Sequence, residues 1–330
     1  MRNNRCIYIN GLRNCPQGFL QYMNQFVEAG ERTGFRALKP YASPRHLFRR
    51  VMPLFFHLAN LFRLGNLRSK PLIVTSRGDG ILEAAFPYYL SYHIIPMLWD
   101  TWPKEQETLF GDLAMLKCPL ALVSSRQMAQ QIEKRLNIKC MWVPEGIDAA
   151  GFSKGDDLNL RSIDVFELGR QHGEYHKAVE AAIAKKYLTR WRGNKYYEDG
   201  RLAELAFKTN EELKENLAKA KIVICFPKVD TCSREESGGI ETLTQRYWEA
   251  MLSRCLIVGR APAELTDLMG YYPVVDVDWN APTEQLKNIL SNISDYQWLV
   301  DKNLEAAKKL APWDGRMNAI KSFINEHLKA

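Results

Sequence analysis

The stretch ESGGIETLTQRYWEAMLSRCLIVG, residues 236–259, combines an amphipathic, helix-length segment with a short apolar run that ends in glycine. Glu241 and Glu249 stand eight residues apart. On a helix over 241–253 they would lie about 80° apart around the axis and roughly two turns apart along it, so both carboxylates would reach one side of a site. This helix followed by an apolar strand is the repeating element of an α/β domain.

The same alternation extends outward from this stretch in both directions. Short apolar runs are predicted as strands at 6–10, 72–76, 94–99, 120–124, 139–143, 163–168, 222–226, 256–259 and 273–277. Helix-length segments separate them, which predicts parallel sheets with crossover helices. At 330 residues the chain is long enough for two such domains. Pro, Gly and paired acids break the pattern over 144–157, so we predict domains at 1–148 and 149–311 that share a site in an interdomain cleft.

Three landmarks carry a resemblance to a known family. Glu-x7-Glu is followed by Ala250-Met251 and a strand that ends in glycine, VPEGID occupies 143–148, and ELGR occupies 167–170. In this order they resemble glycosyltransferase family 4, and the TQRYWEAM variant resembles its polysaccharide-assembly branch. The resemblance implies a GT-B fold with two facing Rossmann-like domains: an acceptor-side domain at 1–148 and a donor-nucleotide domain at 149–311. It also implies that the C-terminal helix, 312–330, packs back on the first domain.

The resemblance assigns roles to residues of the second half. Glu249 would bond the ribose of a nucleoside diphosphate sugar, and Glu241 would contact the donor sugar near the reacting carbon. Arg170 and Lys177 would hold the diphosphate, where positive charge stabilises a leaving group that gains negative charge. The expected reaction is metal-independent hexosyl transfer with retention of configuration, in which the nucleotide sugar is a substrate and no cofactor takes part.

Further residues around the motif are predicted to belong to the site. The flexible Gly238 and Gly239 precede Glu241, whose place at a helix N-terminus favours phosphate binding, and Arg246 lies inside the motif. In the first domain, Asp100 follows the strand at 94–99, where strands open toward a ligand, and we predict an acceptor-side role for it.

The charge of the chain is concentrated at one end. The net charge is +7, but residues 1–70 hold twelve Lys and Arg against two Glu. A local positive excess indicates an anionic partner, and no nucleic-acid motif is present. Residues 43–68 fit an interfacial amphipathic helix on an anionic membrane, and they fit a core helix with a basic outer face equally well. The resemblance to the polysaccharide-assembly branch implies an acceptor that is a saccharide, lipid-linked, of a bacterial surface polysaccharide such as a capsule, O-antigen or exopolysaccharide, and a basic first domain would suit it.

Two other functions remain open at this point, a sugar-nucleotide epimerase of the same fold and a non-catalytic nucleotide-sugar-binding module. His172 and His176 lack metal-type partners in the sequence, and Asp276 with Asp278 resembles the metal motif of a different fold, so no metal site is predicted. Seven cysteines without a CxxC pair, and no signal peptide or transmembrane segment, predict a cytoplasmic protein. The basic N-terminal region adds the expectation of a peripheral position on the inner face of the plasma membrane.

Overall fold

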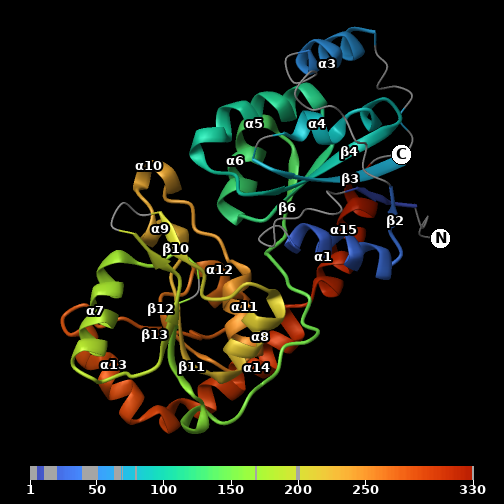
Figure 1. Cartoon of the computed structure of the whole chain (residues 1–330). Helices are drawn as coiled ribbons and strands as arrows, with labels where there is room; N and C mark the ends of the chain where they lie inside the picture. Colours follow the sequence, from blue (N-terminus) through green and yellow to red (C-terminus); the bar gives the residue numbers. More distant parts are fainter. Residues whose placement is uncertain are drawn as a thin grey trace. The chain divides into compact units, whose positions relative to one another are not determined.

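The chain folds into two units. The computed structural model describes residues 6–10, 21–38, 51–62, 68, 70–78, 80–167, 169–197 and 201–328. Unit 1 comprises Met1–Glu145, Arg234–Thr242 and Trp313–Ala330, and unit 2 comprises Gly146–Ser233 and Leu243–Pro312 (Figure 1). The first change of unit, after Glu145, falls inside the expected linker at 144–157.

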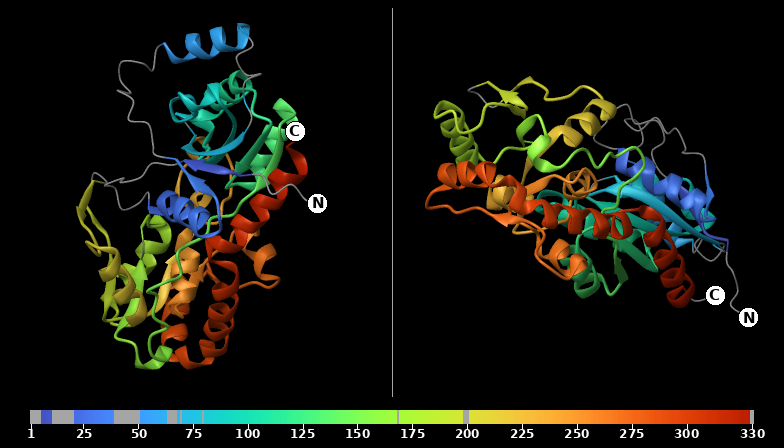
Figure 2. Two further views of the ribbon diagram at one scale, coloured as in Figure 1. Left: turned by 90° about the vertical axis from the view of Figure 1, so that its right-hand side faces the viewer. Right: turned by 90° about the horizontal axis from the view of Figure 1, so that it is seen from below.

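Unit 1 is built on a six-stranded parallel sheet with the order β2-β1-β3-β4-β5-β6. Its strands are β1 (Tyr8–Asn10), β2 (Arg36–Ala37), β3 (Lys70–Arg77), β4 (Tyr92–Trp99), β5 (Leu120–Val123) and β6 (Lys139–Trp142). One face packs on α3 (Met52–Leu61), α4 (Ile81–Ala85), α5 (Pro103–Leu116) and α6 (Arg126–Leu136). The other face packs on α1 (Gln21–Arg32) and the C-terminal α15 (Trp313–His327), which lie side by side (Figure 2).

Unit 2 is built on a five-stranded parallel sheet with the order β13-β12-β11-β7-β8. Its strands are β7 (Ile163–Glu167), β8 (Trp191–Gly193), β11 (Ala220–Cys225), β12 (Leu256–Gly259) and β13 (Val275–Asp276), and a small antiparallel pair is formed by β9 (Lys195–Tyr196) and β10 (Leu202–Glu204). One face packs on α7 (Gly173–Ala184) and α13 (Pro282–Ser291), and the other on α8 (Asn210–Lys219), α11 (Gln245–Leu252) and α14 (Gln297–Leu310) (Figure 1). The remaining short helices are α9 (Lys228–Thr231), α10 (Arg234–Ser237) and α12 (Ala263–Met269), with 3-10 turns η3 (Tyr88–Leu90), η4 (Leu158–Leu160) and η5 (Ile293–Tyr296).

The sheet of unit 2 is buried on both faces, which explains its continuous apolar strands. Alternate residues point to opposite sides: Val165 packs toward α7 and α13, whereas Phe166 packs toward α8 and α11. The chain adds β8 on one side of β7 and β11 on the other, so the strand order reverses between β7 and β11. Open α/β sheets bind ligands outside the carboxyl ends of their strands at such a reversal.

Three expectations from the sequence differ from these bounds. The helix expected over 241–253 begins only at Gln245, and the second domain expected over 149–311 is interrupted because Arg234–Thr242 belongs to unit 1. The strand expected over 273–277 is limited to Val275–Asp276. Within the described residues, no helix has the length and apolar character needed to cross a membrane.

Candidate functional site

The carboxyl end of β7 brings the ELGR motif against α11. Gly169 has φ +80°, a left-handed conformation that glycine adopts without strain. The guanidinium group of Arg246 lies directly on this glycine, because a Cβ atom at position 169 would be 1.9 Å from Arg246 Nη2. The next residue, Arg170, is exposed. Two motifs that are about 80 residues apart in the sequence therefore meet at one strand end, at the point where the strand order reverses.

Glu249 lies one turn along α11 from Arg246, and the two side chains interact electrostatically. Burial raises the pKa of Glu249, and the positive charges of Arg246 and Lys214 oppose that rise. The sequence does not predict that Lys214 acts on Glu249. Lys214 lies on α8, in an ordinary run of charged helix residues that does not single it out. A carboxylate and a guanidinium group side by side can bind hydroxyl groups and phosphate oxygens, respectively.

The end of β7 is held by a buried carboxylate. Glu167 is 2% exposed and accepts hydrogen bonds from Trp191 Nε1 at 2.8 Å and from the ring of His176 at 2.7 Å (Nδ1 to Oε2). The hydrogen bond that the His176 ring donates to Glu167 raises the pKa of His176, although burial partly offsets this rise. Glu167 fixes the strand immediately before the turn at Gly169 and Arg170.

Lys177 lies on the exposed side of α7. In the part of the chain that the structure describes, Lys177 is not one of the charges that act on Glu249, and none of its atoms is among those nearest to a Cβ at Gly169. Its predicted diphosphate role stays a prediction.

Glu241, Gly238 and Gly239 occupy a different part of the structure from the one that their sequence position predicts. They belong to unit 1, in the segment after α10, and Glu241 is not at a helix N-terminus. The backbone N–H of Glu241 donates to Gln127 Oε1 at 2.7 Å, and the side chain of Gln127 donates in turn to Gly239 O at 3.4 Å. The predicted phosphate cradle at a helix starting with Glu241 is therefore wrong.

Tertiary contacts explain why the helix begins late. Ile240 is buried in the core of unit 1, and Leu243 is buried in the core of unit 2, where its N–H donates to Glu264 Oε2 at 2.8 Å. These two anchors keep the residues between them out of the helix. Thr242 and Thr244 are β-branched and do not favour a helix, so the sequence offers little resistance.

Asp100 follows β4 directly, at the carboxyl end of the unit 1 sheet, as the sequence predicts. It has φ +48°, and its Oδ2 accepts from Arg77 Nε at 3.1 Å and from Tyr22 Oη at 3.3 Å. Burial, followed by the charge of Asp100, raises the pKa of Tyr22. Arg77 and Tyr22 hold the carboxylate at the strand end, and its acceptor-side role stays a prediction.

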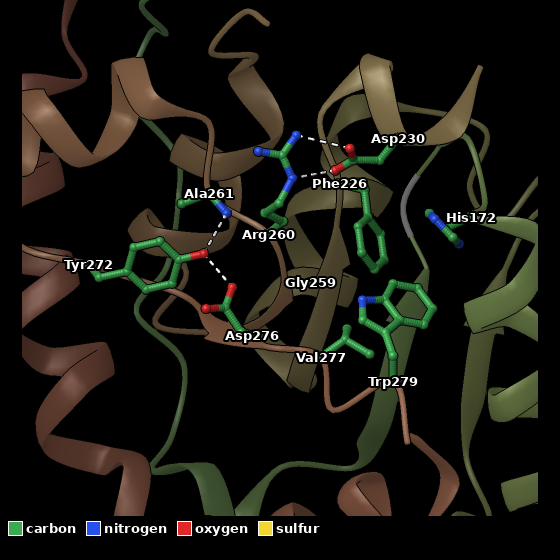
Figure 3. Close-up of a pocket in the computed structure, with 10 residues that line it drawn as sticks. All are labelled: His172, Phe226, Asp230, Gly259, Arg260, Ala261, Tyr272, Asp276, Val277 and Trp279. Carbon is green, nitrogen blue, oxygen red and sulfur yellow. Dashed lines mark hydrogen bonds and ion pairs between the residues drawn. The ribbon is translucent and has the colours of Figure 1, made fainter. Parts of the chain in front are cut away.

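A cavity of about 650 Å³ in unit 2 contains functional candidates that the sequence does not identify (Figure 3). It is formed where chain segments leave the carboxyl ends of β7, β11, β12 and β13. Its lining includes His172, Phe226, Asp230, Arg260, Tyr272 and Trp279. Asp276 also lines it, so this aspartate faces a cavity although the sequence pattern gave it no role. The only signal in the sequence is that aromatic or charged residues follow four of the strands that become neighbours in this sheet. Among the residues that the structure describes, no group of three or more His, Cys, Asp or Glu is placed to hold a metal ion.

Neither a protein-family model nor a curated protein matches the chain. Solved structures match over almost its whole length. Sucrose-phosphate synthase (tll1590) from Thermosynechococcus elongatus has 14% identity and a TM-score of 0.62, with 98% of each chain covered. Anabaena Alr3699/HepE in complex with UDP and glucose has 10% identity and a TM-score of 0.58, with 98% of this chain and 100% of that chain covered. AviGT4, a glycosyltransferase involved in avilamycin A biosynthesis, has 13% identity and a TM-score of 0.55, with 98% of each chain covered.

At these identities the likeness shows the fold. The two parallel sheets, each covered by helices on both faces, and the match over the whole chain give the GT-B fold. The predicted fold class is confirmed.

Proposed function

We propose that the chain is a retaining glycosyltransferase that moves a hexosyl group from a nucleoside diphosphate sugar to a saccharide acceptor. The observation that supports this most is the contact of Arg246 with Gly169 at the carboxyl end of β7, where the strand order reverses. Glu249 lies one turn along α11 from Arg246 and interacts with its charge. One similar structure, HepE, was solved with UDP and glucose. The nucleotide of the donor is proposed to bind at this strand end.

Each residue has a chemical role in the proposal. Glu249 accepts hydrogen bonds from the ribose hydroxyls. Arg246, together with the exposed Arg170, lies beside the diphosphate, and these guanidinium groups stabilise the negative charge that grows on the leaving group. The acceptor hydroxyl attacks on the face that the diphosphate leaves, and the departing phosphate oxygen takes its proton. The resemblance implies that no divalent cation is needed, and the roles of Glu241 and Asp100 remain predictions.

The acceptor is proposed to be a lipid-linked saccharide of a bacterial surface polysaccharide, met at an anionic membrane surface. Of the segment 43–68, the structure describes 51–62 and position 68. Helix α3 contains no Lys, Arg, Asp or Glu, and it buries Met52, Phe56 and Ala59. Its outer side exposes apolar residues, Leu54 (58%), Leu58 (41%) and Leu61 (67%), and Phe62 at its end is 69% exposed. An exposed apolar face within a basic region is typical of helices that lie in a membrane interface.

Donor turnover tests the proposed function. Thermal shift with UDP-, GDP- and ADP-glucose identifies the nucleotide, since a ligand that binds only the folded chain raises the melting temperature. Release of the nucleoside diphosphate is then followed for Arg170→Ala, and Arg190→Ala serves as the matched control. Arg190 is exposed in the same unit but lies before β8, at the amino end of the sheet.

The proposal expects Arg170→Ala to reduce kcat/KM at least about tenfold, the size of one lost charge-assisted hydrogen bond, while Arg190→Ala stays near the wild type. Equal rates in the wild type and Arg170→Ala would exclude the assigned site. Interconversion of the sugar nucleotide without transfer would identify an epimerase, and donor binding without any turnover would identify a binding module.

A further inference from the structure

The cavity shown in Figure 3 is separate from the residues proposed to bind the donor nucleotide. None of Arg170, Arg246 or Glu249 lines it, although it opens at the same carboxyl edge of the unit 2 sheet. Its volume of about 650 Å³ lies within the range of small-molecule sites. Such sites combine apolar walls with a few convergent polar groups, and this cavity has both.

One wall of the cavity is aromatic. The ring centroids of His172 and Phe226 are 4.6 Å apart with an interplanar angle of 38°, and those of His172 and Trp279 are 5.0 Å apart with an angle of 43°. The three rings contact one another, so no flat slot is left between them. Trp279 is nevertheless 50% exposed, which is unusual for an indole packed in this way. The cluster therefore presents an outer aromatic surface beside the cavity.

The opposite wall is polar. Arg260 donates from Nε and Nη2 to the two carboxylate oxygens of Asp230 at 2.6 and 2.9 Å. The hydroxyl of Tyr272 donates to Asp276 Oδ1 and accepts from the backbone N–H of Ala261 at 3.2 Å. Burial and the hydrogen bond to Asp276 raise the pKa of Tyr272 to about 12, so this hydroxyl keeps its proton at neutral pH.

The balance of charge restricts the ligand. Two carboxylates and one guanidinium group line the cavity, and the guanidinium is already paired with Asp230, so the wall does not favour phosphate or another anion. Each carboxylate has about four acceptor positions, more than its partners here occupy, so both can accept from hydroxyl groups. A suitable ligand is neutral, rich in hydroxyls along its edge and apolar on one face.

We propose that this cavity is a saccharide-binding subsite, in which a neutral hexopyranose unit lays its apolar C–H face on Trp279 and gives its hydroxyls to Asp230 and Asp276. A nucleobase fits less well, because the rings that contact each other leave one open face rather than a slot between two. The subsite is distinct from the donor nucleotide site and does not depend on the proposed function. In a transferase it would hold one unit of a longer saccharide and raise the effective concentration of that chain at the enzyme.

The test uses saturation-transfer difference NMR on the full chain with methyl α-D-glucopyranoside, methyl α-D-galactopyranoside and methyl α-D-mannopyranoside. Each glycoside is measured alone and with saturating UDP, and uridine is measured as the nucleobase probe. Trp279→Ala removes the aromatic surface, and Trp298→Ala is the matched control, because Trp298 is 64% exposed on α14 in the same unit and is not part of the cavity. Tyr272→Phe is a second variant that removes only the hydroxyl.

At least one glycoside is expected to bind the wild type and Trp298→Ala equally, and to bind Trp279→Ala about tenfold more weakly, as expected for the loss of one aromatic contact. Binding is also expected to persist in the presence of UDP. The proposal is overturned if no glycoside binds, if Trp279→Ala binds as the wild type does, if UDP displaces the glycoside, or if uridine takes the place of the sugar at Trp279. A failed donor assay with intact glycoside binding would reject the proposed function and leave the subsite standing.

Discussion

Gly169→Ala is a specific test of the candidate donor site. The substitution adds one carbon where the backbone has φ +80°, and that carbon would lie 1.9 Å from Arg246 Nη2 and 2.6 Å from Arg246 Cζ. Two consequences follow from one methyl group. The backbone becomes strained, and the guanidinium group of Arg246 has to leave its position over the turn.

The two effects have different sizes and are measured differently. A non-glycine residue in the left-handed region costs about 1–2 kcal/mol, which a domain with a stability of about 5–15 kcal/mol survives. The guanidinium group is the far end of a flexible side chain, so it moves at little further cost to folding. Loss of its charge-assisted hydrogen bonds to a diphosphate would cost about 1.5–3 kcal/mol of binding, or roughly tenfold to a hundredfold in affinity.

Gly270→Ala provides the matched control. Gly270 ends α12 in the same unit with φ +69°, and a Cβ atom there would meet nothing within 4 Å. Urea denaturation should show a similar loss of stability in both variants. Isothermal titration calorimetry with UDP, GDP and ADP should show weaker nucleotide binding only in Gly169→Ala, and Arg246→Ala should weaken binding without the backbone strain.

The reasoning is refuted if Gly169→Ala binds the nucleotide as tightly as the wild type does, because Arg246 would then have no part in the site. It is also refuted if Gly270→Ala loses as much affinity as Gly169→Ala, because strain alone would account for both. Equal affinity of Arg246→Ala and the wild type would show that the guanidinium over Gly169 has only a structural role.

Three further predictions concern pH and the exposed helix. The protonated ring of His176 donates to Glu167, and the pKa of His176 is raised, so the stability from this pair is complete below about pH 6.5 and is lost as the pH rises through the raised pKa. His176→Gln should therefore lower the free energy of unfolding at pH 6 by about 1.5–3 kcal/mol, measured by calorimetry as a lower melting temperature. An equal loss of stability at pH 9 would contradict this prediction. Burial raises the pKa of Glu249, so its charged form destabilises the fold at pH 7. Glu249→Gln should therefore be more resistant to urea than the wild type at pH 7 but not at about pH 4, and it should bind the nucleotide more weakly. An equal gain in resistance to urea at both pH values would show that the gain has a different cause. Leu61→Asp on α3 should reduce sedimentation of the protein with anionic liposomes at least about tenfold. The control Leu160→Asp, at a residue that is 70% exposed in unit 2, should leave sedimentation unchanged. Unchanged sedimentation of Leu61→Asp would exclude α3 as the part of the chain that contacts the membrane.

Much of the fold could be predicted from the sequence, because apolar runs of a parallel sheet are determined by their own composition. The strand at 256–259 is found at Leu256–Gly259, and the run at 120–124 is found at Leu120–Val123. Strands buried on both faces need uniformly apolar residues, and such runs are visible without any knowledge of their neighbours. The short β2, with only Arg36 and Ala37, could not be predicted, because two residues carry no periodicity.

The helix at residues 241–253 shows where local pattern fails. Its amphipathic spacing is genuine from Gln245 to Leu252, but the residues before it are kept out of the helix by Ile240 and Leu243, each buried in a different unit. Glu241 and Glu249 were predicted to lie on one helix, but they are found in separate units. Spacing along a chain predicts proximity only when the segment has one secondary structure throughout.

The sequence by itself determined the α/β class and most of the strands, because strands buried on both faces need apolar runs that depend only on local composition. The GT-B fold was implied by the resemblance of three motifs to a known family, and the site roles of Arg246 and Glu249 stay predictions. Only the tertiary structure decided that Arg246 packs on Gly169, that Arg234–Thr242 belongs to unit 1, and that residues following four separate strands enclose one cavity. Contacts of that kind join residues far apart in the chain. They depend on how strands and helices pack, which no local pattern of residues specifies.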